Sequence, residues 1–138
     1  MISRNQEHEL IMISIYDALI YDALIYSEMD EVFSLEEVME GVYKLPYAEI
    51  PLFSKEVVIK SLTNVNEIKE IYQKNMPKWK FDRLNALERA ILLMSYTNAK
   101  VDEKADKRVI IDVAIRLAKK YLDEKDYKFV NAILDNTL

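Results

Sequence analysis

The chain has 138 residues, 51% of them apolar, and a formal net charge of −5 at pH 7. This length suits one globular domain over residues 1–138, and the single Gly and three Pro favour long helices over a strand-rich fold with many tight turns. The absence of Cys excludes disulfides and thiolate chemistry, and the acidic balance excludes nucleic-acid binding by bulk charge, so any such binding needs a local basic patch.

The first predicted helix covers residues 4–27 and is apolar over much of its circumference, which favours a central position in a helical bundle. Its apolar run over 10–26 is shorter than the ~20 residues of a membrane span, and Asp17 and Asp22 interrupt it. The polar start lacks the features of a signal peptide. We therefore expect a buried helix in a cytoplasmic protein without a membrane segment.

This helix contains a tandem duplication, YDALI, at 16–20 and again at 21–25. Five residues turn a helix by roughly 500°, so the two copies face about 140° away from each other. We interpret the repeat as a local extension of the helix. In the alternative, Tyr16, Tyr21 and Tyr26 prepare a contact surface for another chain.

A short helix is predicted next, over residues 35–44. Ser34 and Glu37 match a capping box, in which each side chain accepts a hydrogen bond from the other residue's backbone N–H. Phe33 and Val38 match the hydrophobic staple that often accompanies it. The connection that follows, KLPYAEIP, contains two prolines and is expected to be irregular.

The middle of the chain predicts two more helical regions. Residues 52–75 carry a helical apolar pattern, which the segment TNVN at 63–66 either bends or ends. Three apolar side chains are expected to fill the core where the chain then turns: Trp79, Phe81 and Leu84. Asn85 and Glu88 match a second capping box, which predicts a helix over 86–99.

The C-terminal stretch predicts two helices joined by a short charged link, one over 107–122 and one ending near Asp135. Asp106 and Asp126 are their expected N-caps. Apolar residues recur at helical spacing, and we expect them to face the core: Val109, Ile110, Val113, Ala114, Leu117, Ala118, Tyr121, Phe129, Val130, Ile133 and Leu134. Such wide apolar faces need covering helices, so the expected fold class is all-α.

No catalytic or metal-binding constellation is visible. A single Gly cannot build a Gly-rich phosphate loop, and a single His, His8, cannot supply the two Glu-x-x-His pairs of a di-iron bundle. We therefore expect no enzymatic activity, no metal and no cofactor.

Basic residues gather toward the C-terminus: Arg108, Arg116, Lys119, Lys120, Lys125 and Lys128. They form either a solvated face or a patch that contacts phosphates. Phe129 likewise has two interpretations, because its register places it in the core while its basic neighbours suit a platform on which an unpaired base stacks.

Three motifs in order resemble the NusB family of bacterial transcription antitermination factors: LERAILLMSY (87–96), VIIDVAIRLAKKY (109–121) and KFVNAILD (128–135). WKFDRL at 79–84 is also similar to this family, and SRNQEHELIMISIY at 3–16 more weakly. The resemblance implies about seven helices in two subdomains, each like a three-helix bundle. It implies that the chain joins NusE, a protein of the small ribosomal subunit, on single-stranded boxA RNA within the RNA polymerase antitermination complex of ribosomal RNA operons.

The resemblance also implies site residues. Six match the family's RNA surface: Arg4, Asn5, His8, Lys128, Phe129 and Asn131. Two acidic residues match the face that meets NusE: Glu88 and Asp126. Four positions depart from the family pattern: the reduced arginine-rich start, Leu93 for Arg, Ala132 for Gly and Asp106 for Pro. Because each lost phosphate contact weakens binding, we expect the isolated domain to bind RNA weakly.

Two hypotheses about function remain. In the first, the chain is a NusB-type antitermination factor that binds boxA-like RNA with NusE. In the second, it is a NusB-fold interaction module that has lost RNA recognition and binds a protein partner, or itself as a homodimer, through the Tyr-bearing first helix. A third, the RNA-binding domain of a ribosomal RNA cytosine methyltransferase, is disfavoured because that family adds a catalytic domain and this chain stops at Leu138.

Overall fold

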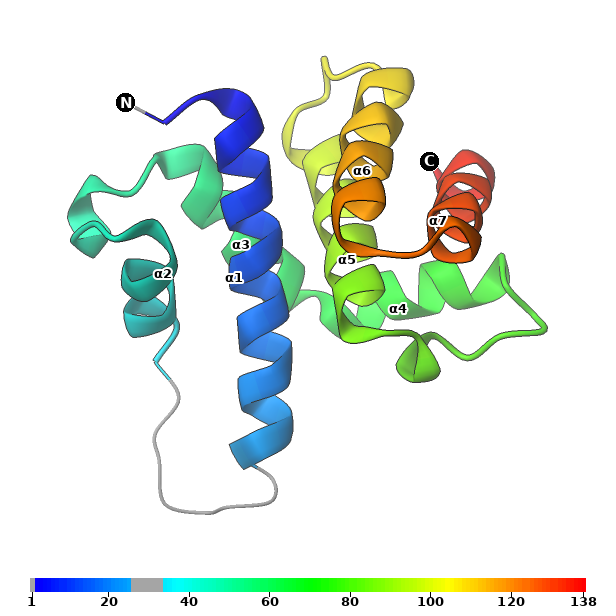
Figure 1. Ribbon diagram of the computed structural model, residues 1–138, viewed down its shortest axis with the longest axis horizontal. Helices are drawn as coiled ribbons and strands as arrows, with labels where there is room; N and C mark the ends of the chain where they lie inside the picture. Colours follow the sequence, from blue (N-terminus) through cyan, green and yellow to red (C-terminus); the bar gives the residue numbers. More distant parts are fainter. Residues whose placement is uncertain (1, 26–33) are drawn as a thin grey trace.

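The computed structural model describes residues 2–25 and 34–138 and places seven α-helices and no strand within them (Figure 1). The helices are α1 (Arg4–Ile25), α2 (Leu35–Tyr43), α3 (Leu52–Thr63), α4 (Val65–Lys74), α5 (Ala86–Val101), α6 (Lys107–Tyr121) and α7 (Glu124–Thr137). Two short 3-10 helices, Tyr47–Glu49 and Phe81–Arg83, lie in the connections. The prediction of an all-α fold with about seven helices is confirmed.

The helix α5 lies at the centre of the molecule. Residues 90–95 are buried without a break, so this helix is covered on every side. It packs against α1 and α3 on one side and against α4, α6 and α7 on the other (Figure 1). The sequence predicted a central position for the first helix, but α1 leaves Arg4, Asn5 and Ile20 exposed. The fully enclosed helix is therefore α5.

The predicted caps of the second and fifth helices are present. The Ser34 hydroxyl accepts a hydrogen bond of 3.3 Å from the Glu37 backbone N–H. The Asn85 side chain accepts one of 2.7 Å from the backbone N–H of Leu87. Phe33 of the expected staple lies outside the described residues, as does the predicted end of the first helix at residues 26 and 27.

The caps of the last two helices agree with the sequence only in part. The Asp106 carboxylate accepts a 2.8 Å hydrogen bond from the Arg108 backbone N–H, as predicted. The last helix begins at Glu124 with Asp123 as its N-cap, so the expectation that Asp126 caps it is wrong. Three acidic residues lie close together in the sequence here: Asp123, Glu124 and Asp126. The first of them, Asp123, has an extended backbone and directly precedes α7.

The TNVN segment ends one helix and begins the next. The helix α3 stops at Thr63, and α4 starts at Val65 after the single residue Asn64. The backbone N–H of Asn64 donates to the carbonyl of Lys60 and so completes the last turn of α3. Of the two outcomes the sequence left open, the chain therefore shows the ended helix.

Three residues expected in the core are exposed: Trp79 by 52%, Val109 by 57% and Tyr121 by 41%. Val109 lies in the first turn of α6 and Tyr121 is its last residue. Trp79 lies in the turn between α4 and α5. Helical spacing shows which side of a helix is apolar but not how far the covering helices extend, so residues near helix ends are the ones predicted wrongly. No helix of the described chain is long and apolar enough to cross a bilayer.

Replacing the only Gly of the chain tests the packing of α2. Gly41 lies inside this helix, and a Cβ placed on it meets no atom within 4 Å. Gly in a helix interior is less stable than Ala by roughly 0.5–1 kcal/mol. Gly41→Ala should therefore raise the free energy of unfolding by about that amount, as measured by urea denaturation followed by circular dichroism. An unchanged or lowered midpoint would show that the site is not open.

Candidate nucleic-acid interface

The turn between α4 and α5 is held by one side chain, that of Gln73. Its Nε2 donates to the carbonyl oxygens of Met76 at 3.2 Å and Trp79 at 2.6 Å, and its Oε1 accepts from the Phe81 backbone N–H at 3.0 Å. Phe81 is 2% exposed, and its ring stacks on that of Tyr72 with the centroids 6.1 Å apart. These contacts fix the backbone that carries Trp79. No sequence pattern points to Gln73, because its partners are backbone atoms of an irregular segment.

Trp79 and Phe129 form an aromatic pair at the surface. Their ring centroids are 5.9 Å apart and their planes meet at 65°, an edge-to-face arrangement. Trp79 is half-exposed, and Phe129 is half-buried against the core. Phe129 thus combines the two interpretations that the sequence allowed, since part of its ring packs inward and part remains on the surface. Trp79 was expected in the core and is instead the second member of this pair.

A cavity of about 510 Å³ lies beside the aromatic pair. Four basic residues line it: Lys78, Lys80, Arg83 and Lys125. None of the four forms an ion pair within the described part of the chain. The same cavity is lined by Glu88 and Asp126, the two acidic residues expected to meet a partner. The fold therefore brings Phe129, Glu88 and Asp126 together, although the sequence places them up to 41 residues apart.

Glu88 sits in the first turn of α5 and is only 6% exposed. The pKa of its carboxyl is raised to about 7, mainly by burial and also by the nearby Asp126 carboxylate, while a hydrogen bond from the backbone N–H of Asn85 opposes the shift. Glu88 is consequently divided between its charged and neutral forms at neutral pH. In the neutral form it can donate a hydrogen bond as well as accept one.

The residues of the expected basic opening lie elsewhere, where the start of α1 meets α6. The Asn5 side-chain oxygen accepts a 2.9 Å hydrogen bond from the Arg116 guanidinium. The Arg4 guanidinium lies over the Phe53 ring, 4.1 Å from its centroid, and 3.6 Å from the Glu7 carboxylate. Both arginines are exposed, so this region presents two cations to solvent.

His8 belongs to the core and not to this surface. It is 7% exposed, its ring meets Phe53 edge-on, and its Nε2 lies 3.5 Å from the Asn98 side-chain nitrogen. Burial lowers the pKa of His8 to about 4, and the charges of Arg4 and Arg116 act in the same direction. At this position His8 exposes little surface that RNA could contact, and its role in RNA binding stays a prediction.

Further basic residues on α6 and α7 are paired with acids. Lys120 lies 2.6 Å from a Glu9 carboxylate oxygen, to which the Tyr121 hydroxyl also donates. The hydrogen bonds from Lys120 and then Tyr121 lower the pKa of Glu9. On α7, Lys128 pairs with Glu124 at 2.8 Å, and both side chains are exposed.

The six residues expected on an RNA surface therefore fall into two groups. Arg4 and Asn5 lie at the start of α1, with His8 beneath them, whereas Lys128, Phe129 and Asn131 lie on α7. The helix α6 packs against both α1 and α7 and separates the two groups (Figure 1). Asn131 is exposed on α7. Across the described chain, no three His, Asp or Glu side chains gather as a metal ion would need.

Residues 9–138 match the sequence model of the NusB family. A curated transcription antitermination protein NusB from Treponema denticola is 39% identical over 124 residues, which are 90% of each chain. Its counterpart from Finegoldia magna is 35% identical over 136 residues, 99% of this chain and 93% of that one.

Two solved structures share the fold. T. maritima NusB superposes with a TM-score of 0.76 at 24% identity, covering 99% of this chain and 92% of that chain. A chain from a structure described as a crystal structure of a plectonemic RNA supercoil superposes with a TM-score of 0.71 at 22% identity, covering 98% and 94%.

The buried His8 should make the protein less stable as the pH falls from 6.5 to 4. The unfolded chain takes up a proton on His8 near pH 6.5, whereas the folded chain does so only near pH 4. Between these values the unfolded state binds more protons, and the loss reaches on the order of 2 kcal/mol. In urea denaturation from pH 7.5 to 4, His8→Gln should flatten this part of the profile. A variant whose profile runs parallel to that of the parent would contradict the assignment.

The raised pKa of Glu88 has the opposite pH dependence. The folded state holds a proton up to about pH 7 and the unfolded state only to about 4.5, so the contribution to stability is present at low pH and is lost as the pH rises through 7. Relative to the parent, Glu88→Gln should gain on the order of 2 kcal/mol between pH 5 and pH 8, measured as the difference in unfolding free energy. Glu103→Gln, at an exposed position, is the control and should show no such gain.

Proposed function

The chain belongs to the NusB family of transcription antitermination proteins, and we propose that it binds boxA-like single-stranded RNA jointly with NusE. In this proposal the complex acts on RNA polymerase at ribosomal RNA operons, in the cytoplasm. The chain contributes an RNA surface and a protein surface and carries out no chemical reaction.

The observation that carries the proposal is the aromatic pair of Trp79 and Phe129 beside four cations. An unpaired base that stacks on an aromatic ring gains about 1–3 kcal/mol. The cavity next to the pair is lined by Lys78, Lys80, Arg83 and Lys125, none of which is paired with an acid in the described chain. Rings that hold bases and cations that hold phosphates are the two requirements of a single-strand site.

The acidic side chains of the same cavity support a protein partner at its edge. Glu88 and Asp126 line the same cavity as Phe129. Two carboxyl groups so close to an RNA backbone repel it, which favours a partner that supplies positive charge there. We therefore assign the edge formed by Glu88 and Asp126 to NusE.

The start of α1 supplies a second contact for RNA. Arg4, Asn5 and Arg116 are exposed there, and Lys119 and Lys120 continue along α6 toward α7. Arg4 is partly neutralised by Glu7, and Lys120 by Glu9. Because fewer unpaired cations release fewer counterions when RNA binds, we expect the chain alone to bind RNA weakly and the chain with NusE to bind it more strongly.

Fluorescence anisotropy of a labelled boxA-type RNA tests the proposal, with the chain and NusE mixed at 50 mM salt or less. Phe129→Leu keeps the apolar contact with the core but removes the ring face, and should weaken binding about tenfold. Tyr47→Leu removes a half-buried ring from the connection between α2 and α3 and should leave the affinity unchanged.

Absence of RNA binding by the parent chain with NusE would overturn the proposal. That outcome would favour a NusB-fold interaction module without RNA recognition. The ion pairs of Arg4, Lys120 and Lys128 with acidic neighbours are the observation that favours this second function.

A further inference from the structure

The charges of the chain are divided unevenly along its length. Residues 5–43 contain ten Asp and Glu residues and no Lys or Arg. The rest of the chain contains all 19 basic residues and 14 of the 24 acidic ones. Almost all of α1 and the whole of α2 therefore lie in an acidic part of the molecule, and the cavity beside Trp79 lies in the basic part.

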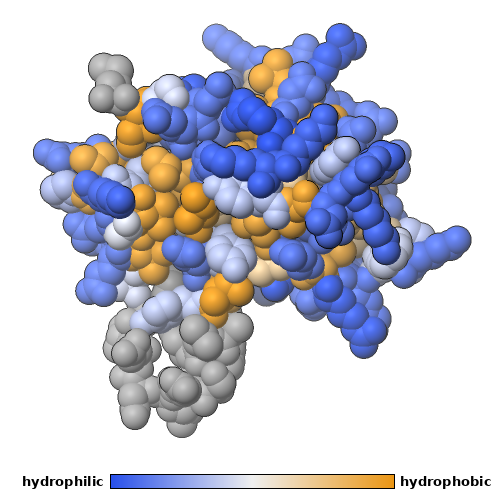
Figure 2. Space-filling view, viewed as in Figure 1, coloured by the Kyte–Doolittle hydropathy of each residue, from blue (hydrophilic) through white to orange (hydrophobic). Residues whose placement is uncertain are grey.

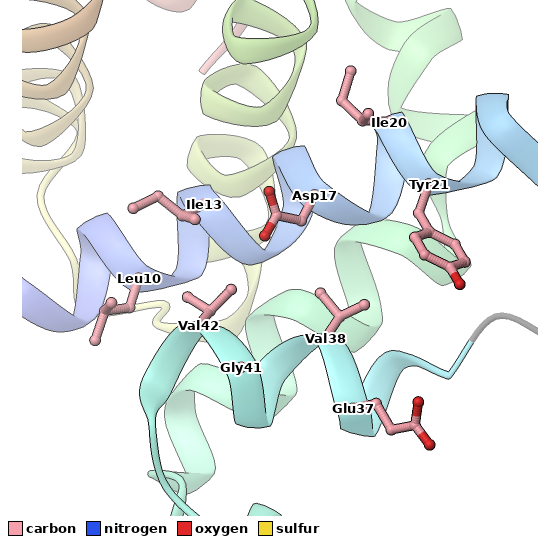
Figure 3. A pocket seen from close by; sticks show the side chains of 9 residues that line it. All are labelled: Leu10, Ile13, Asp17, Ile20, Tyr21, Glu37, Val38, Gly41 and Val42. Carbon is pink, nitrogen blue, oxygen red and sulfur yellow. The ribbon is translucent and has the colours of Figure 1, made fainter.

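A groove of about 530 Å³ lies between α1 and α2 (Figure 3). Five aliphatic side chains line it: Leu10, Ile13, Ile20, Val38 and Val42. Val38 and Val42 point from α2 toward α1 (Figure 3), and hydrophobic residues gather on the surface over these two helices (Figure 2). An apolar groove of this kind, which lies between two helices and is open to solvent, is a common binding site for an amphipathic helix.

The groove also contains a carboxylate, that of Asp17, and the described residues that line the groove include no cation. Asp17 lies on α1 among the aliphatic residues, and neither Lys nor Arg is among the groove's described lining. Burial in these apolar surroundings raises the pKa of Asp17. Glu37 lies at the edge of the groove and adds a second negative charge. A bound partner with a positive charge at this point would relieve an unfavourable arrangement of the unbound protein.

The only Gly of the chain keeps the groove open. Gly41 lines it from α2, and a Cβ at this position would meet no atom within 4 Å. The groove therefore has free space beside α2 at this position, which a side chain longer than that of Ala would enter.

We propose that the groove between α1 and α2 binds a basic amphipathic helix of another protein. Apolar side chains at i, i+3, i+4 and i+7 of that helix pack on the aliphatic lining, and a Lys or Arg pairs with Asp17. A second copy of this chain fits less well, because its basic amphipathic helix, α6, already packs its apolar face against α5 and α7. The proposal is independent of RNA binding.

A synthetic helical peptide of Leu and Lys, with Leu at those four spacings, is the probe. Its affinity is measured by fluorescence anisotropy, and its site is mapped by amide chemical-shift changes in the intact chain. We expect the shifts to concentrate on α1 and α2, and a matched peptide with Glu in place of every Lys to bind at least about tenfold more weakly. Shifts that concentrate elsewhere, or equal binding of the Glu peptide, would overturn the proposal.

Two variants at one position sharpen the test. Gly41→Leu fills the groove from the solvent side and should weaken binding of the Lys peptide at least about tenfold, because it excludes one buried side chain of the partner. Gly41→Ala is the matched control and should keep the parent affinity. Peptide binding that Gly41→Leu leaves unchanged would overturn the proposal.

Two further measurements separate the alternatives. If sedimentation of the protein alone shows a dimer that Gly41→Leu dissociates, the groove is an interface between copies and the proposed partner is wrong. Binding of boxA-type RNA should be the same for Gly41→Leu and the parent. Failure of RNA binding and failure of peptide binding can thus be told apart.

Discussion

The burial of residues 90–95 around the whole circumference of α5 is the constraint on which the rest of the structure depends. A helical segment buried in this way must be covered by other helices on every side. The helices α1 and α3 cover one side, and α4, α6 and α7 cover the other. What remains accessible of α5 lies near its ends. Glu88 in its first turn lines the cavity with Phe129, and Asn98 near its last turn meets His8 of α1.

The two candidate contact regions are therefore fixed relative to each other by one rigid element. Ten residues of helix separate Glu88 from Asn98, a rise of about 15 Å. Neither end of α5 can shift without disturbing a continuous core, so the two regions keep a fixed separation. At both ends a buried ionisable group is held toward its neutral form. Burial raises the pKa of one group, Glu88, and lowers that of the other, His8.

The sequence predicted what depends on local spacing. Helix type and the caps at Ser34, Asn85 and Asp106 follow from neighbouring residues and were predicted correctly, and the segment 63–66 was identified as a point where a helix bends or ends. Apart from the N-cap of the last helix, which is Asp123 and not Asp126, the errors concern contacts between distant segments. Trp79 is exposed in a turn whose backbone Gln73 holds from α4, and the burial of His8 depends on Phe53 and Asn98, which come from other helices.

In the candidate site, too, the sequence identified individual residues but not the contacts between them. Phe129, Glu88 and Asp126 were identified by resemblance to a family, and only the packing of α5 against α7 places them in one cavity. Nothing in the sequence joined Trp79 to Phe129, because a pair 50 residues apart leaves no periodic signal.

The uneven distribution of charge between the two parts of the chain gives the molecule an electric dipole, which an electric field can orient. The acidic helices α1 and α2 lie on one side of α5, and α4, α6 and α7, which belong to the largely basic remainder, lie on the other (Figure 1). A nearby polyanion exerts a torque on such a distribution, turning the basic side inward before contact. The molecule would then be oriented while it diffuses, before it makes specific contacts with the polyanion. The molecule would arrive with its acidic helices facing the solvent, and an increase in ionic strength would slow correctly oriented encounters more than it would alter the fold.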